Sequence, residues 1–270
     1  MPVYFSYHVD PDLYYDIEGL ASPMTVNIPL GITNNEAFDL YFRILIKNPP
    51  AEWSNTSKDL GAISAGASAF KVFDPTRDLP TLTDGEYDET LTLRIEAYKD
   101  AGYTDLYGYA ELEITIHFFD SLDAAWTMVD RDTFDDGTVE GWDSESGGTA
   151  DPSLGLAYAG NPSANSLHYI SSPYGLVNGT VEGYTLYKDY TIGAVSKARI
   201  VIHYWLKSGY KIAIKIGDKL IIPAAVGNVM PKETWVRAAY FLPVNATTRV
   251  RVQVDGEGAL WLDEVRVITK

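Results

Sequence analysis

The chain has 270 residues, of which 46% are hydrophobic and 21% charged, and this length allows two domains that each bury a core. Its formal charge is −16 and it contains no cysteine, so a disulfide framework, a thiolate metal site and a cysteine nucleophile are all excluded. A negative field repels phosphate and no apolar run reaches the ~18 residues of a membrane span, so we expect a soluble protein that binds no nucleic acid and inserts in no membrane.

The first 119 residues contain short segments in which apolar and polar side chains alternate, which is the period of a half-buried strand. Turn-forming clusters of Asn, Pro, Ser and Gly separate these segments at the spacing of an antiparallel sandwich. The alternating segments are residues 25–32, 38–46, 69–73, 90–97 and 110–118. This pattern predicts a β-sandwich of the immunoglobulin-like type over residues 1–120.

Loose motifs in this half support the same prediction. Asn34 is followed by Asn48-Pro-Pro-Ala-Glu-Trp53, Leu60-Gly-Ala-Ile-Ser-Ala-Gly66 and Asp84-Gly-Glu-Tyr87. Their order resembles that of bacterial and archaeal immunoglobulin-like modules. The resemblance implies a spacer or docking unit beside a carbohydrate-active domain.

A domain boundary is expected near residues 120–126, because the strand pattern changes there and the charge balance changes soon afterwards. Residues 1–120 hold 20 acidic and 7 basic side chains, and residues 121–151 hold 9 and 1. Residues 152–270, in contrast, hold 8 acidic and 13 basic side chains. We therefore predict a second domain over residues 127–270 with a local positive surface on an acidic protein.

Two motifs bracket this second domain. The stretch Asp132-Thr-Phe-Asp-Asp-Gly-Thr-Val-Glu-Gly-Trp142 resembles the F-E-D-G-T-x-x-G-W start of the galactose-binding-like jelly rolls. The stretch Ala259-Leu-Trp-Leu-Asp-Glu-Val-Arg-Val267 resembles the W/Y-L-D-D/N-V-x-V end of the same family. Many carbohydrate-binding modules belong to it. Over about residues 130–268 the resemblance thus implies a jelly roll, and the whole chain is predicted to be all-β, with two β-sandwich domains.

The resemblance also implies a structural calcium ion that ties the first strand of the jelly roll to the last. The acid after the opening Phe is Asp135, the acid of the closing motif is Asp263, and Asp136 lies beside the first. A site of six to eight hard oxygen ligands favours calcium over zinc. The family usually has Glu at the position of Asp135. The alternative is that Asp135 and Asp136 only cap backbone amides in a turn.

Strand alternation within the jelly roll separates an apolar face from a face that carries cations and an aromatic ring. In residues 198–207 the apolar face is that of Ile200, Ile202, Tyr204 and Leu206. If residues 198–207, 210–216 and 248–254 share a sheet, as they do in the resembled fold, their outward side chains form one patch. This predicted ligand-binding patch comprises Arg199, His203, Trp205, Lys211, Lys215 and Arg251.

Such a patch suits a sugar, because an exposed indole ring packs on the C–H face of a pyranose and Lys or Arg reach its hydroxyls and carboxylates. The excess of cations favours an acidic or sulfated glycan. The alternative is that Trp205 lies under a loop or a domain contact, and that the cations only protect the sheet from edge pairing.

No motif indicates catalysis. The four histidines are His8, His117, His168 and His203, and they show no metal-ligand spacing. We therefore predict a non-enzymatic glycan-binding or adhesion protein of a cell or virion surface. The alternatives are a purely structural virion, tail or surface-layer subunit, which would form a homo-oligomer or larger assembly, and an accessory part of a carbohydrate-active enzyme. Residues 1–6 show no secretory signal, which favours the virion location.

Overall fold

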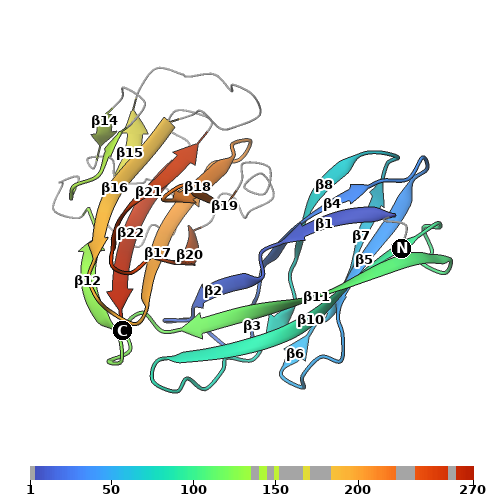
Figure 1. Ribbon diagram of the computed structural model, residues 1–270, viewed down its shortest axis with the longest axis horizontal. Coiled ribbons are helices and arrows are strands. Elements are labelled where there is room, and N and C mark those ends of the chain that lie inside the picture. Colours follow the sequence, from blue (N-terminus) through green and yellow to red (C-terminus); the bar gives the residue numbers. More distant parts are fainter. Residues whose placement is uncertain are drawn as a thin grey trace. The chain divides into compact units, whose positions relative to one another are not determined.

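The computed structural model describes residues 4–134, 140–144, 149–151, 167–170, 184–222, 235–254 and 260–270. Every helix or strand assigned in these residues is a β-strand, which confirms the predicted all-β class (Figure 1). Internal contacts divide the chain into Met1–Asp120, here named unit 1, and Ser121–Lys270, here named unit 2. No helix in the described parts of the chain is long and apolar enough to cross a membrane.

Unit 1 is built from two main sheets and one small one. Its strands are β1 (Phe5–Val9), β2 (Asp12–Asp16), β3 (Met24–Thr25), β4 (Ile28–Asn34), β5 (Leu40–Ile46), β6 (Trp53–Ser54), β7 (Ser57–Ile63), β8 (Ser68–Phe73), β9 (Thr76–Arg77), β10 (Glu86–Tyr98) and β11 (Leu106–Phe119). The larger sheet has the order β2-β11-β10-β5-β7, with β11 and β2 parallel. The others have the orders β1-β4-β8 and β3-β9-β6.

The core of unit 1 follows from the strand period. Along β5 the inward residues Leu40, Phe42 and Ile44 are fully buried, while the residues between them are only partly buried. Trp53 is 6% exposed and its indole Nε1 donates a hydrogen bond to Glu89, so this tryptophan belongs to the core. Whether unit 1 belongs to the immunoglobulin-like modules stays a prediction.

The described residues of unit 2 form two sheets. Its strands are β12 (Thr127–Asp132), β13 (Asp143–Ser144), β14 (Thr149–Asp151), β15 (Leu167–Ile170), β16 (Tyr184–Ile192), β17 (Ala198–Leu206), β18 (Ile212–Ile216), β19 (Lys219–Ile222), β20 (Trp235–Phe241), β21 (Ala246–Val254) and β22 (Leu260–Thr269). The first sheet has the order β14-β15-β22-β17-β20, and β12 also pairs with β22. The second sheet has the order β13-β16-β21-β18-β19.

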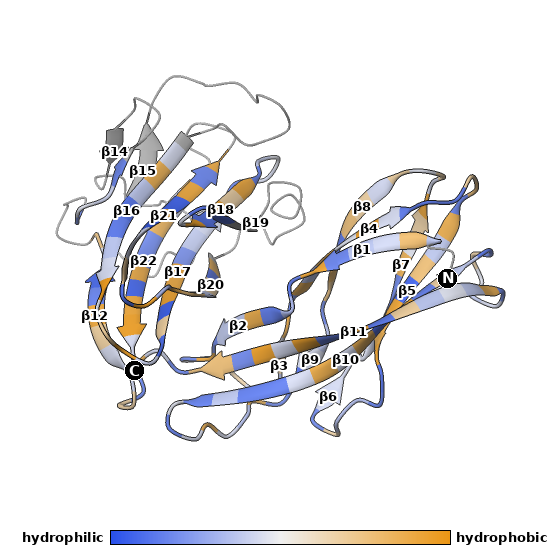
Figure 2. Ribbon diagram, in the orientation of Figure 1, coloured by the Kyte–Doolittle hydropathy of each residue, from blue (hydrophilic) through white to orange (hydrophobic). Residues whose placement is uncertain are grey.

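The inner faces of these sheets are apolar, and Figure 2 shows hydrophobic and hydrophilic residues alternating along β21. The predicted apolar face of residues 198–207 is confirmed, because Ile200, Ile202, Tyr204 and Leu206 are all fully buried. The aromatic residues of the opening motif are also core residues, with Phe134 at 0% and Trp142 at 2% exposure. The motif therefore supplies core residues between β12 and β13.

Candidate functional site

The structure separates the six predicted ligand-binding residues into two groups. Arg199, His203 and Trp205 lie on β17, which pairs with β20 and β22 in the first sheet. Lys215 on β18 and Arg251 on β21 lie in the second sheet, and Lys211 is the residue just before β18. The assumption that all three segments share one sheet is therefore wrong, because a period of two shows which face a residue takes but not which strand lies beside it.

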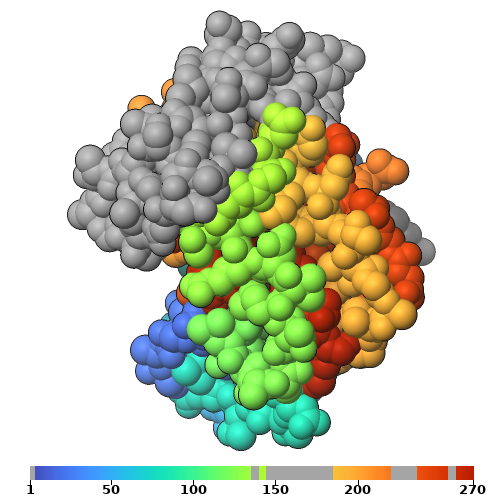
Figure 3. Space-filling view, turned by 90° about the vertical axis from the view of Figure 1, so that its left-hand side faces the viewer, coloured from blue at the N-terminus to red at the C-terminus, as the bar shows by residue number. Residues whose placement is uncertain are grey.

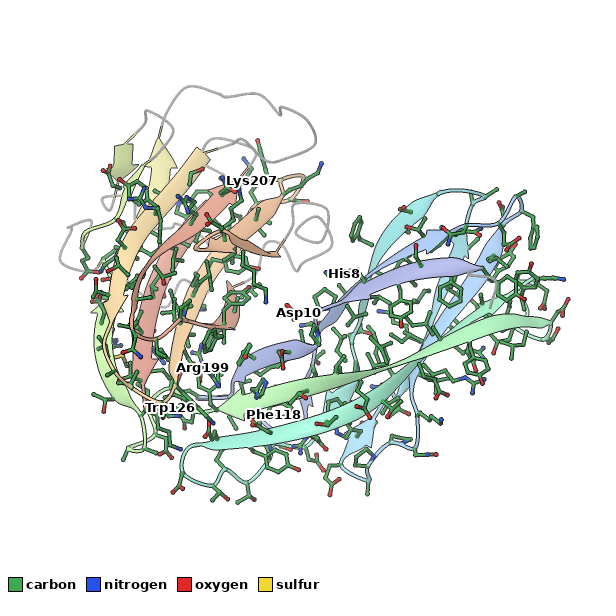
Figure 4. The ribbon with its side chains drawn as sticks, in the orientation of Figure 1. His8, Asp10, Phe118, Trp126, Arg199 and Lys207 are labelled. Carbon is green, nitrogen blue, oxygen red and sulfur yellow. The ribbon has the colours of Figure 1, made fainter. Side chains whose placement is uncertain are left out.

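The group on β17 has no open aromatic ring. Trp205 is 5% exposed and packs edge-to-face on Trp261, with ring centroids 5.1 Å apart. Arg199 is also 5% exposed, and its guanidinium lies 5.8 Å from the centroid of the Trp126 ring (Figure 4). Stacking on a sugar requires an exposed ring face, so Trp205 does not provide the platform that the sequence predicts.

The predicted calcium ligand Asp263 lies on the same sheet. It is 4% exposed, and its Oδ2 lies 3.2 Å from Nδ1 of His203 beside a β-bulge between β17 and β22. Asp135 and Asp136 lie outside the described residues. Within the described ranges there is no group of three or more His, Cys, Asp or Glu that could hold a metal ion. The calcium site therefore stays a prediction.

The second group, Lys211, Lys215 and Arg251, lies on the outer face of the second sheet. An aromatic residue that was not predicted from the sequence, Tyr187, lies on the same face. Strand pairing places Tyr187 of β16 beside Arg251 of β21, and Arg251 beside Lys215 of β18. We name this surface the β16–β21–β18 face. It comprises Tyr187, Asp189, Lys211, Lys215, Arg249 and Arg251. Thr185 and Gln253 share this side of the strands but are buried, at 3% and 8% exposure. Tyr187 is half-buried, as are Lys215 and Arg251.

Ion pairing fixes the side chains of this face. Arg249 Nε and Nη2 donate to the two carboxylate oxygens of Asp189 at 2.7 and 2.8 Å. The same guanidinium lies 4.0 Å from the centroid of the Tyr187 ring, whose hydroxyl donates to Asp143 Oδ2 at 3.2 Å. The hydrogen bond from Arg249 holds the pKa of Asp189 below its usual value, so this carboxylate stays ionised at neutral pH. The Tyr187 ring is therefore held in a defined orientation.

The face combines hydrogen-bond donors of basic side chains with the ring of Tyr187. Arg249 is paired with Asp189, and Arg251 donates from Nη1 to the backbone oxygen of Gly217 at 3.3 Å. Nearby, Gln253 Nε2 donates to Thr185 Oγ1 at 3.0 Å. Guanidinium and ammonium groups in this arrangement offer charge-assisted hydrogen bonds to carboxylates or sulfates.

The sequence did contain a signal for Tyr187. Residues 184–192 alternate, and the outward phase is Thr185, Tyr187, Asp189 and Thr191. The same reasoning places Arg249 and Gln253 outward on residues 248–254. What it does not provide is the adjacency of these two segments, which are about sixty residues apart in the chain.

No family model matches the chain, and no curated protein matches it either. The chain is similar over 98% of its length to the secreted serine protease VesC from Vibrio cholerae, with 13% identity and a TM-score of 0.26, and it covers 50% of that chain. It is similar over 98% to the N-terminal CBM22-1-CBM22-2 tandem domain from Paenibacillus barcinonensis Xyn10C, with 11% identity, 93% coverage of that chain and a TM-score of 0.40.

A third similarity covers 54% of the chain and 99% of the K3 cleaved adhesin domain of Lys-gingipain from Porphyromonas gingivalis W83, with 15% identity and a TM-score of 0.38. Similarities at this level assign neither a family nor a function. The candidate function therefore depends on the residues of the chain itself.

Proposed function

We propose that the protein is a non-catalytic glycan-binding protein and that the β16–β21–β18 face holds an acidic glycan. One observation supports this most directly, namely the row Tyr187–Arg251–Lys215 across three adjacent strands. The row spans two strand spacings of about 4.8 Å each. A phenol ring and two basic side chains thus lie within the length of one short oligosaccharide.

The residue types of the face favour one class of glycan. Lys211, Lys215 and Arg251 are three basic residues on one face of a chain whose formal charge is −16, and Arg249 on the same face pairs with Asp189. A local positive surface attracts carboxylated or sulfated sugars over roughly a Debye length of ~8 Å at physiological salt. Binding to this face should therefore weaken as the salt concentration rises.

A glycan array tests the proposal. The whole protein is applied to neutral, carboxylated and sulfated glycans at low and at physiological salt. We expect signals on acidic glycans that decrease at higher salt. Signals confined to neutral glycans, or no signal on any glycan, would contradict the proposal.

Paired variants then locate the site. The double variant Arg251→Ala with Lys215→Ala should lose binding and show a flatter salt dependence. The double variant Lys47→Ala with Lys58→Ala removes the same charge from unit 1, where these lysines form exposed pairs with Glu111 and Asp74. It should bind like the wild type. Equal losses in both variants would indicate a general charge effect.

The alternative is a purely structural subunit of a virion, tail or surface layer. A role at a cell or virion surface, as an adhesin or as an accessory part of a carbohydrate-active enzyme, is likewise a proposal. Size-exclusion chromatography with light scattering, read together with the glycan array, distinguishes glycan binding from the structural role. A monomer with array signals supports glycan binding, whereas an oligomer without signals supports a structural subunit.

A further inference from the structure

One charged side chain lies on the inward side of β16. Its neighbours on that side, Leu186 and Tyr190, are 1% and 4% exposed, and the Lys188 side chain is 13% exposed. Lys188 Nζ lies 2.6 Å from Oδ1 of Asp132, whose side chain is 3% exposed. Because β12 pairs with β22 and β16 pairs with β21, this contact joins the two sheets of unit 2. Figure 3 shows β12 and β16 side by side on one face.

Three further groups complete the cluster. Asp130 Oδ2 lies 2.8 Å from Lys188 Nζ. The other oxygen of Asp132, Oδ2, accepts hydrogen bonds from Trp142 Nε1 at 2.9 Å and from the Tyr190 hydroxyl at 3.2 Å. One carboxyl oxygen therefore faces the amine, and the other faces two neutral donors.

We propose that Lys188 and Asp132 condense to an intramolecular amide that covalently joins β12 to β16. The neutral Lys188 amine attacks Cγ of the protonated Asp132 carboxyl group, and the new bond is N–C. Asp130 accepts a proton from the attacking nitrogen and returns it to Oδ1, which leaves as water when the Cγ–Oδ1 bond breaks. Trp142 and Tyr190 donate to Oδ2, where negative charge develops. One ammonium and one carboxylate thus give one amide and one water, without an oxidant or a co-reactant.

Condensation requires a neutral amine and a protonated carboxyl group, and burial by itself favours the neutral form of both. It is the main cause that raises the pKa of Asp132, so the carboxyl group retains a proton more readily than usual. Burial also opposes the charged form of Lys188, but hydrogen bonds to Asp130 and Asp132 outweigh it and leave the pKa of the amine raised. Proton removal from the amine is therefore the demanding step, and Asp130 is in contact with it.

The bond would supply a covalent link to a chain that has no cysteine. It would close a segment between residues that are 56 positions apart and so restrict the unfolded chain as a disulfide does. A link between the two sheets suits a domain that must withstand proteases or pulling forces. This inference does not depend on glycan binding.

Intact-mass spectrometry of the denatured full-length protein tests the proposal. We expect the wild type to be lighter than the Lys188→Arg variant by one water, after correction for the substitution. After protease digestion we expect a branched peptide that contains both Asp132 and Lys188. Asp132→Ala should restore the full mass, whereas Asp132→Asn should lose ammonia in place of water.

Two controls make the result specific. Cyclisation of an aspartate with its own backbone also releases water, but it gives no branched peptide and persists in Lys188→Arg. The exposed pair Lys58 and Asp74, with Nζ and Oδ1 2.8 Å apart, should give no cross-linked peptide, because its side chains are 39% and 47% exposed. A wild-type protein of full mass with two separate peptides would overturn the proposal and leave Lys188–Asp132 as an ion pair.

Discussion

Arg249 lies over the ring of Tyr187, with the guanidinium carbon 4.0 Å from the ring centroid. Asp189 holds this guanidinium through two hydrogen bonds of 2.7 and 2.8 Å. Arg249 and Asp189 therefore hold the Tyr187 ring in place on the β16–β21–β18 face.

Tyr187→Ala should weaken glycan binding about two- to twelvefold, because it removes a ring contact worth about 0.5–1.5 kcal/mol. The loss of stability should be small, since the ring is only half-buried. Titration calorimetry with the best acidic glycan measures the effect. Tyr109→Ala is the matched control, because Tyr109 of unit 1 is 56% exposed and also lies against an arginine, Arg94, at 3.9 Å. Equal weakening by both variants would argue against a site at Tyr187.

Trp205→Ala should lower the free energy of unfolding by about 3–5 kcal/mol, the usual cost of removing a large buried aromatic side chain. The structural reason is its 5% exposure and its contact with Trp261. Urea unfolding measures the change. Phe241→Ala serves as the comparison, because Phe241 is 43% exposed on β20 of the same sheet and should cost far less. A stable Trp205→Ala variant with impaired glycan binding would restore the prediction made from the sequence.

Protonation of Glu264 should lower the free energy of unfolding in acid. Burial raises the pKa of this carboxyl group, but hydrogen bonds from Arg266 and Arg131, both at 2.6 Å, outweigh it and hold the pKa below its ordinary value of about 4.3. Because the pKa of Glu264 is lower in the folded than in the unfolded protein, its carboxylate stabilises the fold above the unfolded pKa. This stabilisation is lost as the pH falls through the folded pKa.

Glu264→Gln should therefore cost about 1–3 kcal/mol at pH 7 and progressively less below pH ~4. Thermal unfolding of both proteins across pH 2–7 measures this difference. A difference that does not change with pH would show that the charge of Glu264 is unimportant.

Tyr204→Phe should raise the free energy of unfolding by about 1 kcal/mol. Tyr204 is fully buried, and its hydroxyl has no hydrogen-bond partner in the described part of the chain. Leaving a buried polar group unpaired is costly, and phenylalanine removes that cost. Tyr190→Phe is the opposite control, because its hydroxyl donates to Asp132 at 3.2 Å. In chemical denaturation, Tyr204→Phe should have the highest free energy of unfolding, the wild type an intermediate one and Tyr190→Phe the lowest.

Calcium should raise the melting temperature if Asp135 and Asp263 form the predicted site, since a ligand that binds only the folded state stabilises it. A chelator should remove the gain. Asp263→Ala should abolish the response to calcium, although it also removes the partner of His203 at 3.2 Å. His203→Ala therefore accompanies it as a control that leaves both carboxylates in place. Identical melting curves in calcium and in chelator would exclude the site.

The sequence by itself determined the class of fold and the inner face of individual strands. The alternation of residues 198–207 predicted that Ile200, Ile202, Tyr204 and Leu206 are buried, and all four have 0% exposure. This succeeds because a strand turns successive side chains to opposite faces, which is a local property of the backbone.

Only the tertiary structure decided which outward residues come together. Trp205 and Arg251 both point away from the inner faces, yet they lie on different sheets, and Trp205 is buried against Trp261. Tyr187 lies beside Arg251 because β16 pairs with β21, and Lys188 contacts Asp132 because one sheet of unit 2 packs on the other. Such pairings depend on hydrogen bonds and packing across the whole domain, and no local pattern of residues encodes them.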